Sequence, residues 1–279
     1  MELKRNQYVI DGIPVTRIVE KYGSPLYIYE SAKMVSQYKR MMNAFSGAKV
    51  KINYAAKALT NLNVLKLFKQ LGSGLDAVSI QEVKLGLKAG FSPQDIIYTP
   101  NCVSLEEIES VAAMGVRINI DNISILEQFG HKYGNTIPVC IRINPHIMAG
   151  GNQKISTGHI DSKFGISIYQ TPHVKRVVET NKMRVEGLHM HTGSDILDVD
   201  VFLRGAEIIF NTAKEFSDLD YIDFGSGFKV AYKPDDIETD IEMLGQHLSD
   251  RFNAFCEEYG KELTLIFEPG KYLVSEAGY

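Results

Sequence analysis

Two kinds of apolar pattern alternate along this chain. Short runs rich in β-branched residues, such as VKINYAAKA at residues 50–58, are typical of strands buried on both faces of a sheet. Longer runs with an apolar residue at every third or fourth position, such as SIQEVKLGLKAG at residues 79–90, predict amphipathic helices. The predicted strands are residues 50–58, 74–79, 95–101, 117–122, 138–145, 185–194, 219–227 and 263–270.

Strands that alternate with helices in this way predict an α/β fold, a (β/α)8 barrel. Residues 31–279 have about the 250 residues that such a barrel needs. A doubly wound open sheet is the alternative, but the turn after the first strand, residues 53–61, lacks the GxGxxG motif of its dinucleotide-binding form. Residues 1–30 lie outside the repeat, and we expect a strand, a helix and a second strand there.

The composition narrows the class of protein. With 44% hydrophobic residues the chain can bury a full core, and a formal net charge of -4 with both signs interspersed argues against a nucleic-acid partner. No apolar run reaches the roughly 18 residues of a membrane span. The three cysteines follow no CxxC pattern, and the N-terminus lacks the apolar stretch of a signal peptide. We therefore expect a cytoplasmic protein that acts on a small molecule.

Polar residues stand near the C-terminal end of each predicted strand, where barrels of this kind place their active sites. The connection after the fifth strand, residues 146–166, is also longer than the roughly 2–6 residues usual for such a loop, so it is a candidate functional segment. The strand-end residues are Lys57, Asp76, Asn101, Asp121, Arg142, His191 with Ser194, Gly225–Ser226–Gly227, and Glu268.

Lys57 is the candidate nucleophile of this set. A lysine enclosed by apolar side chains loses solvation of its ammonium form, so its pKa falls and it can form a Schiff base. The alternative is a lysine that extends to solvent at the barrel rim, which is the commoner outcome for a single lysine at a strand end.

Three further features fit one ligand. The turn FGSGF at residues 224–228 can direct backbone N–H groups at an anion, and His191 could lie flat against a bound ring, although a core histidine is the alternative. Glu268 ends a buried strand and precedes Pro-Gly, so its carboxylate needs a partner. Pyridoxal 5'-phosphate calls for this combination: an amine for its aldehyde, a cradle for its phosphate, a flat contact and an acid at its ring nitrogen.

The chain also resembles a known family over nearly its whole length, the alanine-racemase-like (fold type III) pyridoxal-phosphate decarboxylases. Within that family the motif ISTG at residues 155–158 is most similar to the enzymes that decarboxylate meso-2,6-diaminopimelate to L-lysine. The segments that carry the resemblance, in order, are YAAKALTNLNVLKLF, GSGLDAVSIQEV, RINP, ISTGHIDSKFGI, GLHMHTGS, IDFGSGF and FEPGKYLV.

The resemblance implies a role for each matching residue. It implies that Lys57 is the Schiff-base lysine, that His191 stacks on the cofactor ring and that Glu268 pairs with the pyridine nitrogen. Asp76 and Arg142 would lie near the lysine and the ring. The phosphate would lie at Ser194 and at Gly225, Ser226 and Gly227, and the substrate would contact Ser156, Thr157 and Lys271. No metal is implied.

The sequence departs from the family pattern in three respects. Ser226 replaces the middle glycine of a Gly-Gly-Gly turn, and Lys271 replaces an arginine, so a point charge stands where the family has a bidentate fork. In the family a β domain follows the barrel and helps to form the site across a homodimer, whereas this sequence stops at Tyr279, soon after the eighth predicted strand. We expect residues 1–30 to be part of such a domain and residues 31–279 to be the barrel, which alone would bind the cofactor but decarboxylate poorly.

Other readings of the chemistry stay open from the sequence. The chain could decarboxylate another basic amino acid (ornithine, arginine or carboxynorspermidine), or it could be a non-catalytic chain that binds the cofactor and acts by association. Histidines 189 and 191, two apart on one strand, could chelate a metal as in amidohydrolase-type barrels. Those barrels place the pair on the first strand, which here ends at Lys57. A racemase is disfavoured because alanine racemases have an arginine at the pyridine nitrogen, where this chain has Glu268.

Overall fold

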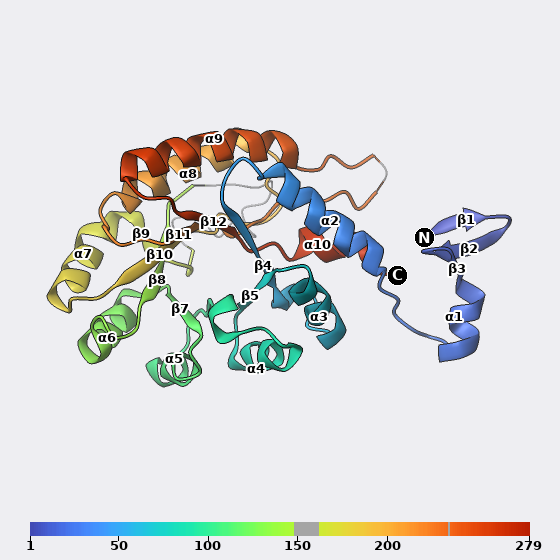
Figure 1. Ribbon diagram of the computed structural model, residues 1–279, viewed down its shortest axis with the longest axis horizontal. Coiled ribbons are helices and arrows are strands. Elements are labelled where there is room, and N and C mark those ends of the chain that lie inside the picture. Colours follow the sequence, from blue (N-terminus) through green and yellow to red (C-terminus); the bar gives the residue numbers. More distant parts are fainter. Residues whose placement is uncertain (148–161, 234) are drawn as a thin grey trace.

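A computed structural model describes residues 1–147, 162–233 and 235–279, most of which form a barrel surrounded by helices (Figure 1). In these residues the barrel strands are β4 (Val50–Ala55), β5 (Gly74–Ala77), β6 (Ile96–Tyr98), β7 (Arg117–Ile120), β8 (Val139–Asn144), β10 (Val185–His189), β11 (Tyr221–Asp223) and β12 (Thr264–Phe267). The helices are α1 (Val15–Tyr22), α2 (Ser31–Ala44), α3 (Leu62–Gln70), α4 (Ile80–Ala89), α5 (Leu105–Ala112), α6 (Ile123–Tyr133), α7 (Thr171–Thr180), α8 (Val199–Ala213), α9 (Ile241–Tyr259) and α10 (Lys271–Val274).

The sheet of barrel strands is parallel and closed. β4 pairs with β5 on one side and with β12 on the other, and β10 pairs with both β8 and β11. Because a doubly wound sheet is open and has two edge strands, that alternative is wrong. Each of the eight predicted strands is present within its predicted range, which confirms the (β/α)8 barrel. A short strand, β9 (Ile166–Ser167), extends the sheet beside the end of β8.

The helices cover the outside of the barrel (Figure 1). Strands β5, β8 and β10 are buried along their whole length, as expected for strands covered on both faces. One residue from each of four strands, Ile97, Cys140, Tyr221 and Ile266, forms a small cluster apart from the main core, as side chains that point into a barrel do. None of the helices in the described parts of the chain combines the length and apolar character that a bilayer span requires.

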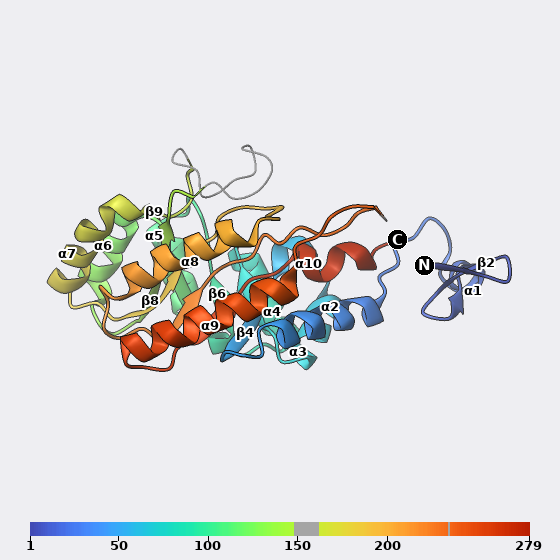
Figure 2. The ribbon, with the colours of Figure 1, turned by 90° about the horizontal axis from the view of Figure 1, so that it is seen from above.

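The first 22 residues form a small unit beside the barrel (Figures 1 and 2). Strands β1 (Glu2–Lys4), β2 (Gln7–Ile10) and β3 (Ile13–Pro14) make an antiparallel sheet, and α1 follows directly. The expected order of strand, helix and strand is wrong, because positive φ angles at Asn6 and Gly12 allow two reversals before the helix. The expected second strand is reduced to an isolated bridge between Tyr29 and Gly278.

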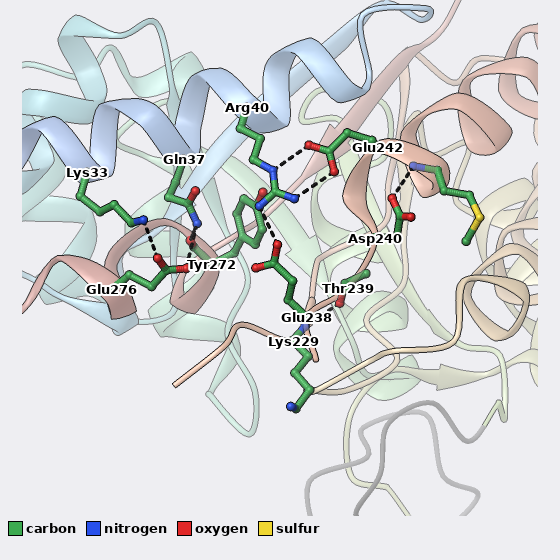
Figure 3. Close-up of polar contacts among 11 residues, drawn as sticks. Lys33, Gln37, Arg40, Lys229, Glu238, Thr239, Asp240, Glu242, Tyr272 and Glu276 are labelled. Atoms are coloured by element: carbon green, nitrogen blue, oxygen red, sulfur yellow. Dashed lines mark hydrogen bonds and ion pairs between the residues drawn. The ribbon is translucent and has the colours of Figure 1, made fainter. Parts of the chain in front are cut away.

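Polar contacts fasten α2 to the segments on either side of it (Figure 3). The guanidinium of Arg40 donates to both carboxylate oxygens of Glu242 at 2.7 and 2.9 Å and to Glu238 at 3.0 Å. At the other end, the amide of Gln37 donates to the carbonyl oxygen of Tyr272 at 3.4 Å, and Lys33 pairs with Glu276 at 2.6 Å. These contacts hold α10 in place, and α10 directly follows Glu268-Pro269-Gly270.

Candidate active site

A cavity of about 600 Å³ opens at the C-terminal ends of the barrel strands. Its volume lies within the range of roughly 300–1,000 Å³ that is usual for small-molecule sites. Asp76 and Gly225 support residues of its lining, and Ser156 and Thr157 lie outside the described residues. The predicted site residues in the lining are Lys57, Arg142, His191, Ser194, Ser226, Gly227, Glu268 and Lys271.

Lys57 follows β4 and reaches across to β5. Its ammonium contacts the carboxylate of Asp76, which is fully buried, whereas about half of the Lys57 side chain (51%) is exposed to the cavity. The hydroxyl of Thr99 donates to the other oxygen of Asp76. Asp76 is therefore held by two neighbours, and it in turn fixes the position of the amine.

The pKa of Lys57 is higher than usual in this structure. Burial lowers it, but the charges of Asp76 and Glu268 together outweigh burial and raise it. The expectation that apolar surroundings depress this pKa is wrong, because two carboxylates from other strands face the amine. Lys57 must give up a proton before it can act as a nucleophile, and Asp76 is the adjacent acceptor.

His191 and the turn at residues 225–227 form one unit. Gly225 and Gly227 have φ angles of +59° and +113°, and a Cβ at residue 225 would lie 2.5 Å from His191 Nδ1. The N–H of Ser226 donates to the same Nδ1 at 3.2 Å, so the imidazole carries its proton on Nε2. Desolvation, with the positive charges of Arg142 and Lys57, lowers the pKa of His191 to about 3, so the ring is neutral.

The turn offers fewer backbone donors to an anion than its sequence suggests. The N–H of Gly225 donates to Asp223 Oδ1 at 2.8 Å, and the N–H of Ser226 is used by His191. In the part of the chain that the structure describes, the N–H of Gly227 has no acceptor. Of the three N–H groups of this turn, an anion at this end of the cavity would therefore meet that of Gly227, together with the side chains of Ser194, Ser226 and Lys271.

Lys271 lies at this anion end. Its ammonium pairs with Asp195 and lies 3.4 Å from the hydroxyl oxygen of Ser194. Asp195 was not predicted, and its φ of 58° places it in the left-handed region that Asp tolerates better than most residues. The pair puts a positive and a negative charge together where the family has an arginine.

Glu268 is 7% exposed and is fixed by its backbone. Its N–H donates to the carbonyl oxygen of Gly225 at 2.6 Å, and the next carbonyl, that of Pro269, accepts from the N–H of Ala55 at 3.1 Å. These bonds tie the carboxylate to both the glycine turn and the end of β4. Burial, followed by the charges of Asp223 and Asp76, raises the pKa of Glu268 well above its usual value.

His189 and Asp223 share this buried space; Asp223 was not predicted, and His189 was named only in the alternative of a metal site. Polar atoms of His189, Asp223 and Glu268 lie within 4.8 Å of one another, and His189 Nε2 is 3.4 Å from Glu268 Oε2. The sequence signal for each was a polar residue at the end of a strand and between apolar residues: Asp223 in IDFG and His189 in GLHM.

The alternative in which His189 and His191 chelate a metal together has no support in the ring contacts. Nδ1 of His189 contacts the amide of Asn119 at 2.6 Å, and Nδ1 of His191 accepts from Ser226. Each ring therefore has its own partner inside the protein.

Arg142 and a nearby asparagine complete the wall. The buried guanidinium of Arg142 lies 4.8 Å from the ring centroid of Phe164, and burial lowers its pKa. Asn101, which also lines the main cavity, donates to Asp121 at 2.5 Å, and the two line a second cavity as well.

The donor set of the main cavity fits pyridoxal 5'-phosphate. The cavity is surrounded by the amine of Lys57, the neutral ring of His191 and the buried carboxylate of Glu268. Lys271 lies at the end where an anion would bind. The Oε1 oxygen of Glu268 is a buried polar atom for which the described residues supply no hydrogen-bond donor.

The relatives of this chain agree with that fit. A diaminopimelate decarboxylase of Methanothermobacter thermautotrophicus is 33% identical over 99% of the chain, and one of Bacillus subtilis is 31% identical over 96%. The crystal structure of diaminopimelate decarboxylase from Helicobacter pylori complexed with L-lysine has a TM-score of 0.85, with 30% identity over 95% of this chain and 68% of that one. The chain spans 66% and 65% of the length of the first two relatives.

The family assignment rests on most of the sequence. Residues 31–275 match the family described as pyridoxal-dependent decarboxylase, pyridoxal binding domain. The resemblance seen in the motifs is thereby confirmed, and pyridoxal 5'-phosphate is the cofactor that the family implies. This chain belongs to the pyridoxal-dependent decarboxylases, and residues 31–275 are its pyridoxal-binding domain.

Proposed function

We propose that the protein uses pyridoxal 5'-phosphate, attached through Lys57, to decarboxylate meso-2,6-diaminopimelate to L-lysine. The observation that carries the proposal is the convergence of Lys57, Glu268 and the anion end on one cavity of about 600 Å³. The names of the relatives support the substrate, and the Helicobacter pylori relative is complexed with L-lysine, the expected product.

Lys57, Asp76 and Thr99 form the attachment site in this proposal. Asp76 holds the amine at the end of β4 and takes up its proton, while Thr99 fixes the carboxylate. Without its proton, the amine can bond covalently to an aldehyde carbon.

His191, Glu268 and Lys271 orient the ring. The neutral imidazole would pack against one face of the ring, held by its contact with the N–H of Ser226. Glu268 would pair with the ring nitrogen, and Lys271 with Ser194 would bind the phosphate end. When bound, the cofactor supplies the electron sink that accepts the electron pair left by departing carbon dioxide. A carboxylate at the ring nitrogen keeps that nitrogen protonated and so preserves the sink.

Release of carbon dioxide and formation of lysine test this proposal. The purified protein, supplied with pyridoxal 5'-phosphate, should convert meso-2,6-diaminopimelate to one carbon dioxide and one L-lysine per turnover. Ornithine, arginine and carboxynorspermidine, offered separately and in competition, test the other substrates. A protein that forms the cofactor chromophore but releases carbon dioxide from none of the four would be a non-catalytic cofactor-binding chain.

We also propose that residues 1–30 are a unit distinct from the barrel of residues 31–279. The separate sheet β1–β3 supports this division, as does the start of the family match at residue 31. Limited proteolysis should cut first between Gly23 and Glu30, where the described backbone forms neither helix nor regular strand. The family resemblance supports a homodimer, which light scattering tests, and the cysteine pattern supports a cytoplasmic location.

A further inference from the structure

Two carboxyl groups meet in the interior of the barrel beneath the cavity. Asp223, at the end of β11, is fully buried, and Glu268, just after β12, is 7% exposed. A carboxylate oxygen of Asp223 and one of Glu268 lie within 4.8 Å of each other. Asp223 Oδ2 and Glu268 Oε1 are both buried, and the described residues offer neither of them a donor.

A hydrogen bond between two carboxyl groups requires a proton on one of them. Two ionised carboxylates at contact distance in a buried space repel strongly, so such pairs hold a proton between them. The other oxygen of Asp223 already accepts from the N–H of Gly225 at 2.8 Å. Asp223 thus has one oxygen on the glycine turn and the other in the buried space that it shares with Glu268, so it stands between the phosphate side of the cavity and the ring-nitrogen side.

We propose, resting on the function proposed above, that Asp223 is a positioning residue which carries this proton and donates it to Glu268 Oε1. Glu268 then remains ionised and would face the ring nitrogen of the cofactor. In the chain without cofactor the proton can lie on Glu268. When a protonated ring nitrogen faces Glu268, the proton would pass from Glu268 to Asp223 within the buried space that the two share, with no change in total charge.

The charged groups around the pair are consistent with a single shared proton. Burial, ahead of every neighbouring charge, raises the pKa of both Asp223 and Glu268. Asp76 on β5 adds negative charge, and Lys57 after β4 adds positive charge. Arg142 on β8 is a second cation. Burial and the negative charge of Asp223 raise the pKa of the Cys140 thiol, so this thiol is neutral. His189 on β10 is neutral as well, because burial lowers its pKa. Two cations beside the pair disfavour a divalent metal ion there.

His189 limits the ways in which Glu268 can turn. The amide nitrogen of Asn119 lies 2.6 Å from Nδ1, and because an amide nitrogen only donates, the neutral ring has its proton on Nε2. Nε2 lies 3.4 Å from Glu268 Oε2, and the described residues give that nitrogen no hydrogen bond. His189 is therefore a neutral neighbour on the Oε2 side of Glu268, and Asp223 is an acid in the same buried space.

The test compares Asp223→Asn with Asp223→Leu. The asparagine amide can donate to Glu268 Oε1 and accept from Gly225, so it reproduces a protonated aspartic acid but not an anion. We expect Asp223→Asn to bind pyridoxal 5'-phosphate within about threefold of the original protein, and Asp223→Leu to bind at least about tenfold more weakly. Binding is followed by the chromophore that borohydride bleaches, and folding by thermal melting. Glu186→Gln, at a buried carboxyl outside the cavity, serves as the matched control.

A pH series separates a proton donor from a merely structural residue. As the pH rises through the raised pKa values of the pair, the original protein loses the shared proton, whereas the asparagine variant keeps its donor. The dissociation constant of the original protein, divided by that of Asp223→Asn, should therefore rise with pH. The ratio is used because the ionisations of Lys57 and of the cofactor are common to both proteins and cancel.

Two results would overturn the proposal. If Asp223→Asn binds the cofactor as weakly as Asp223→Leu does, then Asp223 acts as an anion. If the ratio of the two dissociation constants in the pH series does not depend on pH, then Asp223 carries no proton. If Asp223→Leu fails to fold, the asparagine comparison and the pH ratio still decide the matter. These outcomes need no amino-acid substrate, so a failure of decarboxylation is separate from them. Absence of any chromophore in the original protein would instead contradict the proposed function.

Discussion

Gly225 lies against the imidazole of His191, so closely that a Cβ at residue 225 would be 2.5 Å from Nδ1. The contact explains why this turn position has no side chain even though the middle residue of the turn, Ser226, does. The N–H of Ser226 then fixes the same nitrogen. The turn is therefore as much a support for the ring as a cradle for an anion.

Gly225→Ala tests this contact. The methyl group should displace His191 and weaken binding of pyridoxal 5'-phosphate by about tenfold or more, in addition to the roughly 1–2 kcal/mol of strain that alanine has at a positive φ. Gly12→Ala is the control, since Gly12 also has a positive φ (+77°) but no atom within 4 Å of the place a Cβ would occupy. It should lose a similar amount of stability and keep its cofactor affinity. Equal affinities of the two variants would contradict a role for the contact with His191.

Lys271→Met separates a phosphate contact from a substrate contact. If Lys271 binds the phosphate end, the variant should lose about tenfold in affinity for pyridoxal 5'-phosphate and little for pyridoxal, which has no phosphate. Asp195→Asn frees Lys271 from its ion pair, so this variant should bind pyridoxal 5'-phosphate more tightly than the original protein does. A Lys271→Met variant with unchanged cofactor affinity and a raised KM for the amino acid would instead place Lys271 at the substrate.

Thr99→Val removes one of the two partners of Asp76 without changing the shape of the side chain. The carboxylate then has a buried oxygen with no donor, which costs roughly 1–3 kcal/mol. We expect slower formation of the bleachable chromophore, because Asp76 no longer holds the Lys57 amine in one position. Stopped-flow absorbance measures this rate. An unchanged rate would show that Lys57 alone fixes Asp76.

The buried carboxyl groups predict a pH dependence for the stability of the cofactor-free protein. The pKa of Glu268 is raised in the folded state above its unfolded value of about 4.3, so the folded protein holds the proton more tightly. This contribution to stability is complete below the unfolded pKa and is lost as pH rises through the folded pKa. Glu268→Gln should therefore raise the melting temperature more at pH 8 than at pH 5, while it reduces decarboxylation. A larger gain at pH 5 would mean that Glu268 is ionised in the folded protein.

The barrel and its ring of polar residues could be predicted because both follow from local pattern. Apolar runs separated by capped helices define β4 to β12, and strand ends such as Lys57 and Glu268 must meet at one end of a closed parallel barrel. The two hairpin reversals at residues 5–6 and 11–12 were missed because the strands they join are only two to four residues long.

Interactions across the barrel could not be predicted in the same way. The pKa of Lys57 depends on Asp76 and Glu268, which are distant in sequence, and burial alone gave the wrong sign. Likewise, two of the three backbone donors of the glycine turn are used by Asp223 and His191, a fact that only the folded geometry reveals. Polar residues on neighbouring strands can be placed at the same end of the barrel from sequence, but which of them touch depends on side-chain direction.

The most direct test of the proposed function is to find where the cofactor attaches. The protein is incubated with pyridoxal 5'-phosphate, reduced with borohydride and digested, and the modified peptide is identified by mass. Lys163→Ala is the control, because Lys163 also lines the cavity. We predict one modified residue, Lys57, and loss of both label and chromophore in Lys57→Ala but not in Lys163→Ala. A chromophore that persists in Lys57→Ala with the label on Lys163 or Lys271 would contradict attachment through Lys57.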